Sequence, residues 1–158
     1  MKALIAALKA LVADTRAAAD AGPAVMARLL AIKGIGPGSA GILFTEGLFR
    51  PFDNRRQVAA YAGLAPTPWR SGTIRCEQGV SKAGNPRLRT TLIQLAWLWL
   101  RHQPQTAISR WFHDRVRQNG GRLKKVMITA VARKLLVALW KYVTRGVIIE
   151  GMVMTTTA

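Results

Sequence analysis

The stretch PTPWRSGTIR, residues 66–75, carries one serine hydroxyl among residues that suit phosphate chemistry. Ser71 lies between Arg70 and Gly72, and Arg75 follows four residues later. A guanidinium group can hold two phosphate oxygens at once, and a glycine lets the backbone come close to a bound group. A serine hydroxyl held in this way could attack a phosphodiester. The same residue types also suit a plain phosphate contact or a turn, so composition alone leaves these roles open.

More cations follow this serine along the chain. Residues 66–89 hold five basic residues and one acid, Glu77. A second serine, Ser81, lies in the same region, and Cys76 is an alternative nucleophile that no neighbouring residue clearly favours. We expect the basic side chains to bind a DNA backbone, because cations neutralise phosphates. They are Arg70, Arg75, Lys82, Arg87 and Arg89.

The chain offers little for metal-dependent or nucleotide chemistry. It has seven acidic residues, and no two of them lie three or four positions apart on one helix face. A two-metal nuclease site needs several convergent carboxylates, so we expect none here. His102 and His113 have no cysteine or acid beside them, which argues against zinc. The phosphate-binding loop motif G-x-x-x-x-G-K-[ST] is absent as well. We therefore expect no metal and no cofactor bound by this chain.

The charge of the whole chain points to a polyanionic partner. The formal net charge is +17, with 24 lysines and arginines against 7 acids. Residues 1–49 carry 5 basic and 3 acidic residues, net +2, whereas residues 50–158 carry 19 and 4, net +15. A basic field of this size binds phosphate backbones by counterion release. An anionic membrane surface and a ribosomal type of structural role are the alternatives.

The remaining bulk properties indicate one folded domain in a reducing compartment. The chain has 158 residues, half of them hydrophobic, and a single cysteine that allows no internal disulfide. Charges at Lys9, Asp14 and Arg16 interrupt the apolar start, which argues against a signal peptide. No apolar stretch has the roughly 18 residues that a membrane span needs. We expect no membrane association and a cytoplasmic, nucleoid-associated location.

The hydrophobic pattern predicts an all-α fold. Residues 3–19 form an Ala- and Leu-rich helix with few partners of its own, typical of a linker or coiled coil. Gly22-Pro23 is expected to end it and to start another helix. Residues 24–48 resemble a helix-hairpin-helix unit, in which Gly34 and Gly36 allow positive φ and the turn binds a DNA phosphate. Tight packing of the two helices is the alternative reason for these glycines.

The later elements follow from caps and breaks. Asp53 or Asn54 caps a helix within residues 50–65, and Asn85-Pro86 opens another. Between them, residues 67–82 or so predict a short β-hairpin or an extended loop. Helices follow at 106–118 and 122–145. The expected buried residues are Leu88, Leu92, Leu95, Leu98 and Trp99, then Val126, Ala130, Val131, Leu135 and Leu139. We expect the aromatic residues Trp97, Trp99, Trp111, Phe112 and Trp140 to pack in the core and not to stack on bases.

Four stretches in a fixed order resemble a known family. They are IKGIGPGSAGILFTEGLFRPFDNRRQVAAYAGLAP, WRSG, GVSKAGNPRLR and VMITAVARKLL. Together they resemble the C-terminal transposase domain of the IS110/IS116/IS902 insertion-sequence family, the bridge-RNA-guided DNA recombinases. The resemblance covers roughly residues 28–140, and the combination is far more specific than any one piece.

The resemblance implies a mechanism. Family members join a RuvC-like N-terminal domain, which carries a DEDD metal site, to a helical domain with a nucleophilic serine that forms a phosphoserine link to DNA. The position that matches this serine is Ser71. Ser81, beside Lys82 and near Asn85, is a secondary candidate that we interpret as a structural or backbone-binding position. DNA is the expected partner, with a guide RNA as a further one, and Mg²⁺ is expected only from a RuvC-like partner domain.

The sequence departs from the family pattern in lacking the RuvC-like half. We therefore expect residues 1–22 to be the end of a connector helix, residues 23–150 to be the transposase C-terminal domain, and residues 151–158 to be a frayed tail. Oligomers with itself or with an intact transposase would complete the site. The alternative is a non-catalytic truncated remnant that only binds nucleic acid or an intact transposase. A basic RNA-binding structural protein is a third interpretation.

Overall fold

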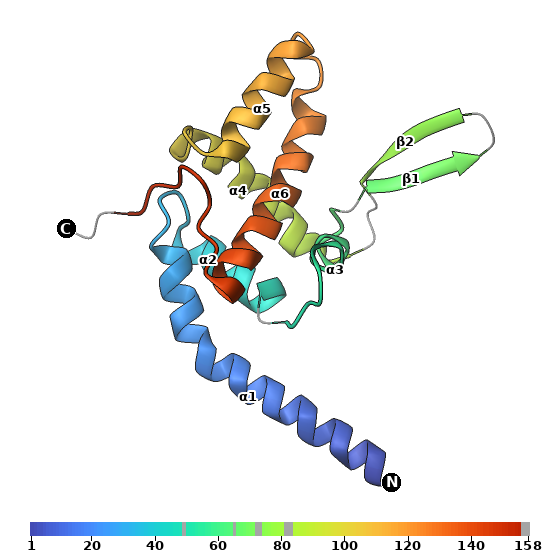
Figure 1. Ribbon diagram of the computed structural model, residues 1–158, viewed down its shortest axis with the longest axis vertical. Helices are drawn as coiled ribbons and strands as arrows, with labels where there is room; N and C mark the ends of the chain where they lie inside the picture. The colour runs from blue at the N-terminus through green and yellow to red at the C-terminus, as the bar shows by residue number, and fades with distance from the viewer. Residues whose placement is uncertain (49, 65, 72–73, 81–83, 156–158) are drawn as a thin grey trace.

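A helical body, from which one long helix and one β-hairpin extend, makes up the computed structural model (Figure 1). It describes the backbone of residues 1–48, 50–64, 66–71, 74–80 and 84–155, and the side chains of residues 1–13, 22–48, 50–64 and 84–155. In chain order the elements are α1 (Lys2–Leu30), α2 (Pro37–Leu43), the π-helix η1 (Phe44–Leu48), α3 (Arg55–Tyr61), β1 (Pro66–Ser71), β2 (Ile74–Val80), α4 (Pro86–His102), α5 (Ala107–Gln118) and α6 (Lys124–Arg145). The predicted helical class with one short hairpin is confirmed.

The core centres on α4 and α6, which pack against each other, and buried side chains of the other helices complete it. Leu88, Leu92, Leu95 and Trp99 of α4 and Val131, Leu135 and Leu139 of α6 are at most 1% exposed. Their spacing of three and four residues places each set on one helix face, as the pattern predicts. The predictions for Leu98 and Val126 are wrong, because these side chains are 38% and 62% exposed. Leu98 lies beside the stripe that faces α6, and Val126 lies in the first turn of α6, which projects beyond the body (Figure 1).

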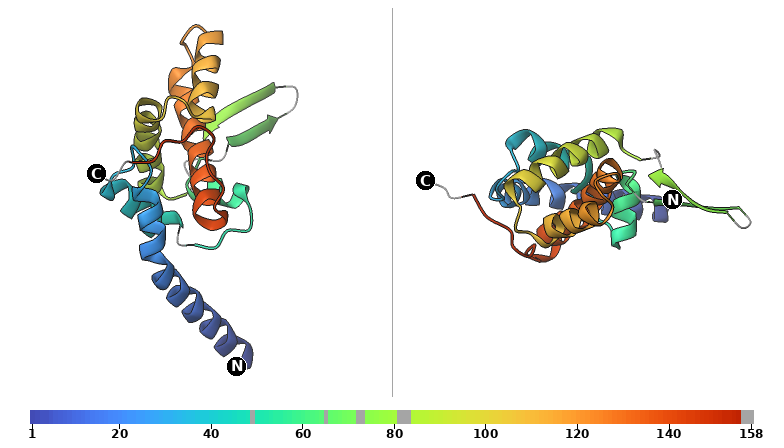
Figure 2. Two further views of the ribbon diagram at one scale, coloured as in Figure 1. Left: turned by 60° about the vertical axis from the view of Figure 1, so that its left-hand side comes forward. Right: turned by 90° about the horizontal axis from the view of Figure 1, so that it is seen from above.

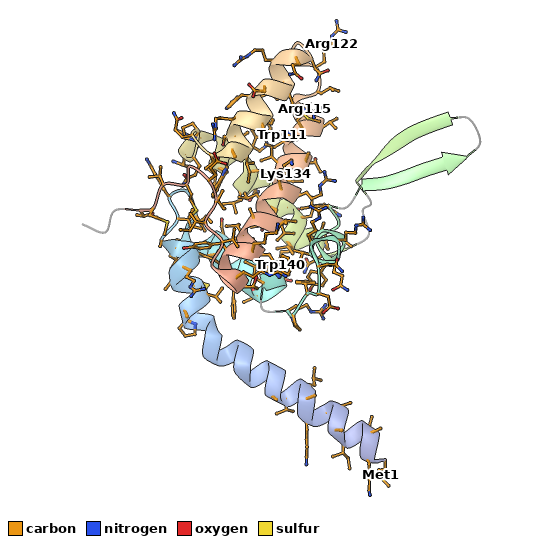
Figure 3. All side chains as sticks on the ribbon, viewed as in Figure 1. Met1, Trp111, Arg115, Arg122, Lys134 and Trp140 are labelled. Atoms are coloured by element: carbon orange, nitrogen blue, oxygen red, sulfur yellow. The ribbon has the colours of Figure 1, made fainter. Side chains whose placement is uncertain are left out.

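Four of the five helical aromatic residues pack as expected. Phe112, Trp99 and Trp140 are at most 3% exposed, and the indole Nε1 of Trp99 donates to Thr106 Oγ1 at 3.0 Å. Trp111 is partly buried under Lys134 of α6, whose Nζ lies 4.6 Å from the ring centroid; Figure 3 shows this pair between α5 and α6. Trp97 contradicts the prediction, because 41% of this residue is exposed.

The long helix α1 runs through the expected break. Pro23 lies inside α1, so the prediction that Gly22-Pro23 separates two helices is wrong. Packing of the last turns explains the continuity: Leu29 is fully buried, and Arg28 Nη1 donates to the Val143 carbonyl at 3.3 Å. These contacts outweigh the hydrogen bond that proline cannot make. The first turns of α1 extend away from the helical body (Figures 1 and 2).

Helix ends follow the predicted local signals. Of the two proposed caps of α3, the structure uses Asn54, whose side chain accepts from the N–H groups of Arg56 and Gln57. Asn85 caps α4 in the same way, with Pro86 in the first turn.

Although α1 is 29 residues long, no helix in the described part of the chain combines the length and apolar character that crossing a membrane needs.

The C-terminal segment is tied down as far as residue 155, which corrects the expectation of a frayed tail from residue 151. Met154 forms an isolated antiparallel bridge with Ile32. The fully buried side chain of Gln103 lies beneath it: Nε2 donates to the carbonyls of Lys33 and Val153, and Oε1 accepts from the Val153 N–H at 2.8 Å. One amide side chain thus joins the C-terminal segment to the turn after α1. Residues 156–158 lie outside the described residues.

We expect Gln103→Leu to lower the free energy of unfolding by about 2–4 kcal/mol, because it leaves buried backbone groups without partners. Urea unfolding followed by circular dichroism measures this loss. Gln118→Leu on exposed α5 is the matched control and should change stability by less than about 0.5 kcal/mol. Equal stability of the two variants would show that the amide does not hold the segment.

Candidate nucleic-acid interface

The hairpin that carries Ser71 stands away from the helices. β1 and β2 pair antiparallel, and in each view of Figures 1 and 2 the hairpin extends away from the helical body. Ser71 is the last residue of β1, and its Cα partner across the ladder is Ile74. One step back, Arg70 is the partner of Arg75. The structure describes the backbone of the two strands, and residues 72–73 and the side chains of the hairpin lie outside the described part.

The base of the hairpin is fixed by close backbone packing. Gly84 has φ +126°, and a Cβ there would lie 2.5 Å from the nitrogen of Gly63 and 2.9 Å from the carbonyl oxygen of Tyr61. The next residue, Asn85, donates its N–H to the same Tyr61 carbonyl at 2.9 Å. The end of α3 and the start of α4 therefore meet where the hairpin leaves the body. Only glycine has both the conformation and the space for this contact.

Arg87 and Arg89 lie in the first turn of α4, next to this base. Arg87 Nη1 lies 3.4 Å from Glu46 Oε1, and Asn85 Nδ2 donates to Glu46 Oε2 at 2.7 Å. Because the Arg87 side chain is 69% exposed, this ion pair contributes little stability and leaves the guanidinium accessible. Glu46 of η1 thus braces the N-terminal cap of α4. Sequence reasoning missed this role, because the two partners lie 39 and 41 residues away from it.

Three further arginines add charge beside α3. Arg55 and Arg56 occupy the first turn of α3 and are exposed, and the Arg50 guanidinium lies 4.8 Å from the Tyr61 ring centroid. Figure 1 shows α3 close to the point where the hairpin leaves the body. These residues were not among the predicted site residues. The sequence does contain a signal for them: two arginines directly follow the Asn54 cap. Cations at a helix N-terminus oppose the helix dipole, so they point to a role other than stability.

The glycine turn between α1 and α2 is not part of this surface. Figures 1 and 2 place it across the helical body from the hairpin. Gly34 has φ +99°, and a Cβ there would lie 3.1 Å from His102 Cβ, so packing accounts for this glycine. Gly36 has φ −88°, which corrects the expectation of a positive φ. The structure does not bring Gly34 and Gly36 together with Ser71.

The other predicted residues divide into two groups. Ser81 and Lys82 lie outside the described residues, and Cys76 is placed only by its backbone, opposite Trp69 in the ladder. His113 is exposed, and His102 is partly buried against Gly34. Within the described ranges, no three side chains of His, Cys, Asp or Glu gather where they could hold a metal ion.

Known proteins resemble this chain over most of its length. The profile of the transposase IS116/IS110/IS902 family matches residues 26–111. Protein y4rJ of Sinorhizobium fredii, which is named as a transposase, is 69% identical over 139 residues, which are 87% of this chain and 35% of that protein. A Pseudomonas aeruginosa protein named as a family 20 transposase is 35% identical over 78% of this chain and 37% of its own length. The transposase for insertion sequence element IS1328 of Yersinia enterocolitica is 28% identical over 77% of this chain and 36% of its own length. This chain thus spans about a third of the curated relatives that it matches.

Proposed function

Because the chain belongs to the transposase IS116/IS110/IS902 family, we propose that it acts as the DNA-binding and strand-transfer part of an insertion-sequence transposase. Ser71 is the nucleophile in this proposal. Arg70 and Arg75 hold the phosphate, and Lys82, Arg87 and Arg89 hold the flanking strand. The observation that carries the proposal is the position of Ser71 at the far end of a hairpin that extends into solvent beside a basic surface.

The proposed chemistry exchanges one phosphate ester for another. The Ser71 hydroxyl oxygen attacks the phosphorus of a DNA phosphodiester and forms a phosphoserine bond. The bond from phosphorus to one sugar oxygen breaks, and the proton lost by the serine ends on the released sugar hydroxyl. Arginine favours this exchange because a guanidinium stabilises the charge that develops on the phosphate oxygens. A RuvC-like domain from another chain would supply the metal-dependent half of a composite site.

The hairpin register supports an anion at this place. Arg70 and Arg75 occupy directly opposed positions of an antiparallel pair, which like charges destabilise. A two-stranded hairpin with sparse contacts to the body is also marginal in water. A phosphate between or beside the two arginines would remove their repulsion. A bound DNA strand would add contacts that stabilise the hairpin. Arg55, Arg56 and Arg87 continue the positive surface at the base.

The test is a search for a covalent protein–DNA species. This chain, carrying a distinguishable tag, is mixed with labelled donor DNA and an intact family member whose own matching serine is replaced by alanine. A labelled band at the mass of this chain plus DNA, stable on a denaturing gel, supports the proposal. If binding occurs without such a band, the chain is a non-catalytic binding module.

The exposed rod of α1 supports self-association as part of this function. Leu4, Leu8 and Leu11 are between 53% and 66% exposed, and they follow one another at helical spacing along one face. A second copy of α1 would cover this stripe as in a coiled coil, and such an oligomer would present two hairpins. A guide RNA is a further partner proposed from the family.

We expect Leu8→Glu to weaken self-association by about tenfold or more, because a charge in the apolar seam costs at least about 1.4 kcal/mol. Sedimentation velocity over a concentration series measures this. Ala10→Glu, on the opposite side of α1, adds the same charge and should leave association unchanged. A wild-type chain that stays monomeric at high micromolar concentration would contradict the proposal.

A further inference from the structure

The outer face of α4 carries a continuous exposed stripe. Its members recur every three or four residues, so they lie in a row along the helix. They are Arg87, Thr90, Gln94, Trp97 and Arg101. The opposite face of α4 is the buried leucine stripe of the core. The stripe therefore begins near the base of the hairpin and runs about 20 Å along α4, at 1.5 Å per residue.

Trp97 is the unusual member of this stripe. It is 41% exposed, whereas Trp99 on the same helix is 1% exposed. The Nζ atom of Lys124, the first residue of α6, lies 5.8 Å from the Trp97 ring centroid. Two more large apolar side chains next to these residues in sequence, Leu98 and Leu123, are 38% and 39% exposed. An indole left partly in water beside an ammonium group has apolar area available for a partner.

The two segments that meet at Trp97 and Lys124 are positively charged. Residues 94–101 and 122–126 together contain four cations and no acid: Arg101, Arg122, Lys124 and Lys125. All four are exposed, and the ion pairs recorded among the described residues involve none of them. Arg122 lies at the outer tip of the α5–α6 pair (Figure 3). The charge of this surface is complementary to a phosphate backbone, not to another basic copy of this chain.

From these features we propose that Trp97 stacks on an unpaired base of single-stranded DNA, while Arg101 and Lys124 bind the phosphates on its two sides. Any base presents a flat face to an exposed indole once it is unpaired, whereas the bases of a duplex already stack on one another. The single-stranded chemistry follows from this surface alone. The choice of DNA as the strand rests on the proposed function, because the proposed strand exchange would open a DNA duplex beside the hairpin.

The direct test compares labelled oligothymidine, oligouridine and duplex DNA of equal length by fluorescence anisotropy. Trp97→Ala should weaken binding of the single-stranded DNA by about 5- to 150-fold, the effect of removing one stacking platform. Duplex binding should change less than about twofold. Trp97→Phe should restore most of the affinity, because an aromatic face remains. Ile148→Ala, which removes an apolar side chain that is 73% exposed outside this surface, is the matched control.

Salt dependence separates stacking from charge. Trp97→Ala should leave the slope of log affinity against log salt unchanged, since no phosphate contact is lost. Lys124→Gln should reduce the magnitude of that slope by about 0.7, as expected for one phosphate on a single strand. Photocrosslinking of an oligonucleotide with 5-bromodeoxyuridine, followed by mass spectrometry, should identify Trp97 as the attached residue.

Three results would overturn the inference. One is equal loss of single-stranded and duplex affinity in Trp97→Ala, and another is no loss of single-stranded affinity in that variant. A stronger effect on oligouridine than on oligothymidine would replace DNA with RNA. The adduct assay is independent of these outcomes, because Ser71 lies on the hairpin and Trp97 on α4. Failure of the serine chemistry with intact Trp97-dependent binding would reject only the proposed function.

Discussion

Ser71→Ala is expected to abolish the covalent protein–DNA species while DNA binding stays within about twofold of the wild-type affinity. The substitution removes the atom that forms the new phosphate ester, and loss of a nucleophile costs roughly 10³-fold or more. Binding survives because it depends on cations, and the hydroxyl carries no charge. The measurement is the tagged-chain assay with labelled donor DNA, read on a denaturing gel, with anisotropy as the binding readout.

Ser81→Ala is the control for this result. It removes the same hydroxyl ten residues further along the chain, in the same basic region, and should leave the adduct at wild-type yield. If Ser81→Ala lost the adduct and Ser71→Ala kept it, Ser81 and not Ser71 would be the nucleophile. Adduct formation by both single variants would exclude either serine as the sole nucleophile.

Gly84→Ala is expected to lower the free energy of unfolding by about 3 kcal/mol and to reduce adduct formation. At φ +126° an alanine is strained by about 1–3 kcal/mol. Its Cβ would also meet the backbone of Gly63 and Tyr61, which cannot move as freely as a side chain tip. Relief of the clash separates the end of α3 from the start of α4, and the hairpin then loses its fixed origin. Urea unfolding measures the stability.

Gly41→Ala gives the matched glycine comparison. Gly41 lies in α2, and a Cβ there would meet nothing within 4 Å. Because alanine favours a helix more than glycine does, this variant should be more stable by about 0.5–1 kcal/mol. Wild-type stability and adduct yield in Gly84→Ala would show that the close backbone contact does not position the hairpin.

Local chemistry made several elements predictable. Asn54 and Asn85 cap helices because their side chains accept from nearby N–H groups, and such caps depend on only three or four residues. The prolines and glycines of residues 66–84 likewise predicted the break in helical structure where the hairpin lies. The break expected at Gly22-Pro23 failed, because long-range packing of Leu29 and Arg28 overrode the local signal.

Candidate site residues were predictable as types but not as a group. The basic stretch after residue 66 was evident, yet Glu46 was not, because its contacts with Asn85 and Arg87 join distant parts of the chain. Gly34 and Gly36 suggested a phosphate contact, and the fold instead placed their turn across the body from the hairpin. Spacing on α4 gave both Trp97 and Trp99 as core residues, although neighbours cover only Trp99.

The sequence by itself determined the helical class, the positive charge after residue 49, the capped helix starts and the family, because each depends on composition or on residues close in the chain. Only the tertiary structure decided that Gln103 holds the C-terminal segment, that Gly84 must approach Gly63, and that Trp97 remains open beside Lys124. The physical reason is that burial and hydrogen-bond partners are set by segments that fold together from far apart in the sequence. No local pattern records which face of a helix those segments will cover.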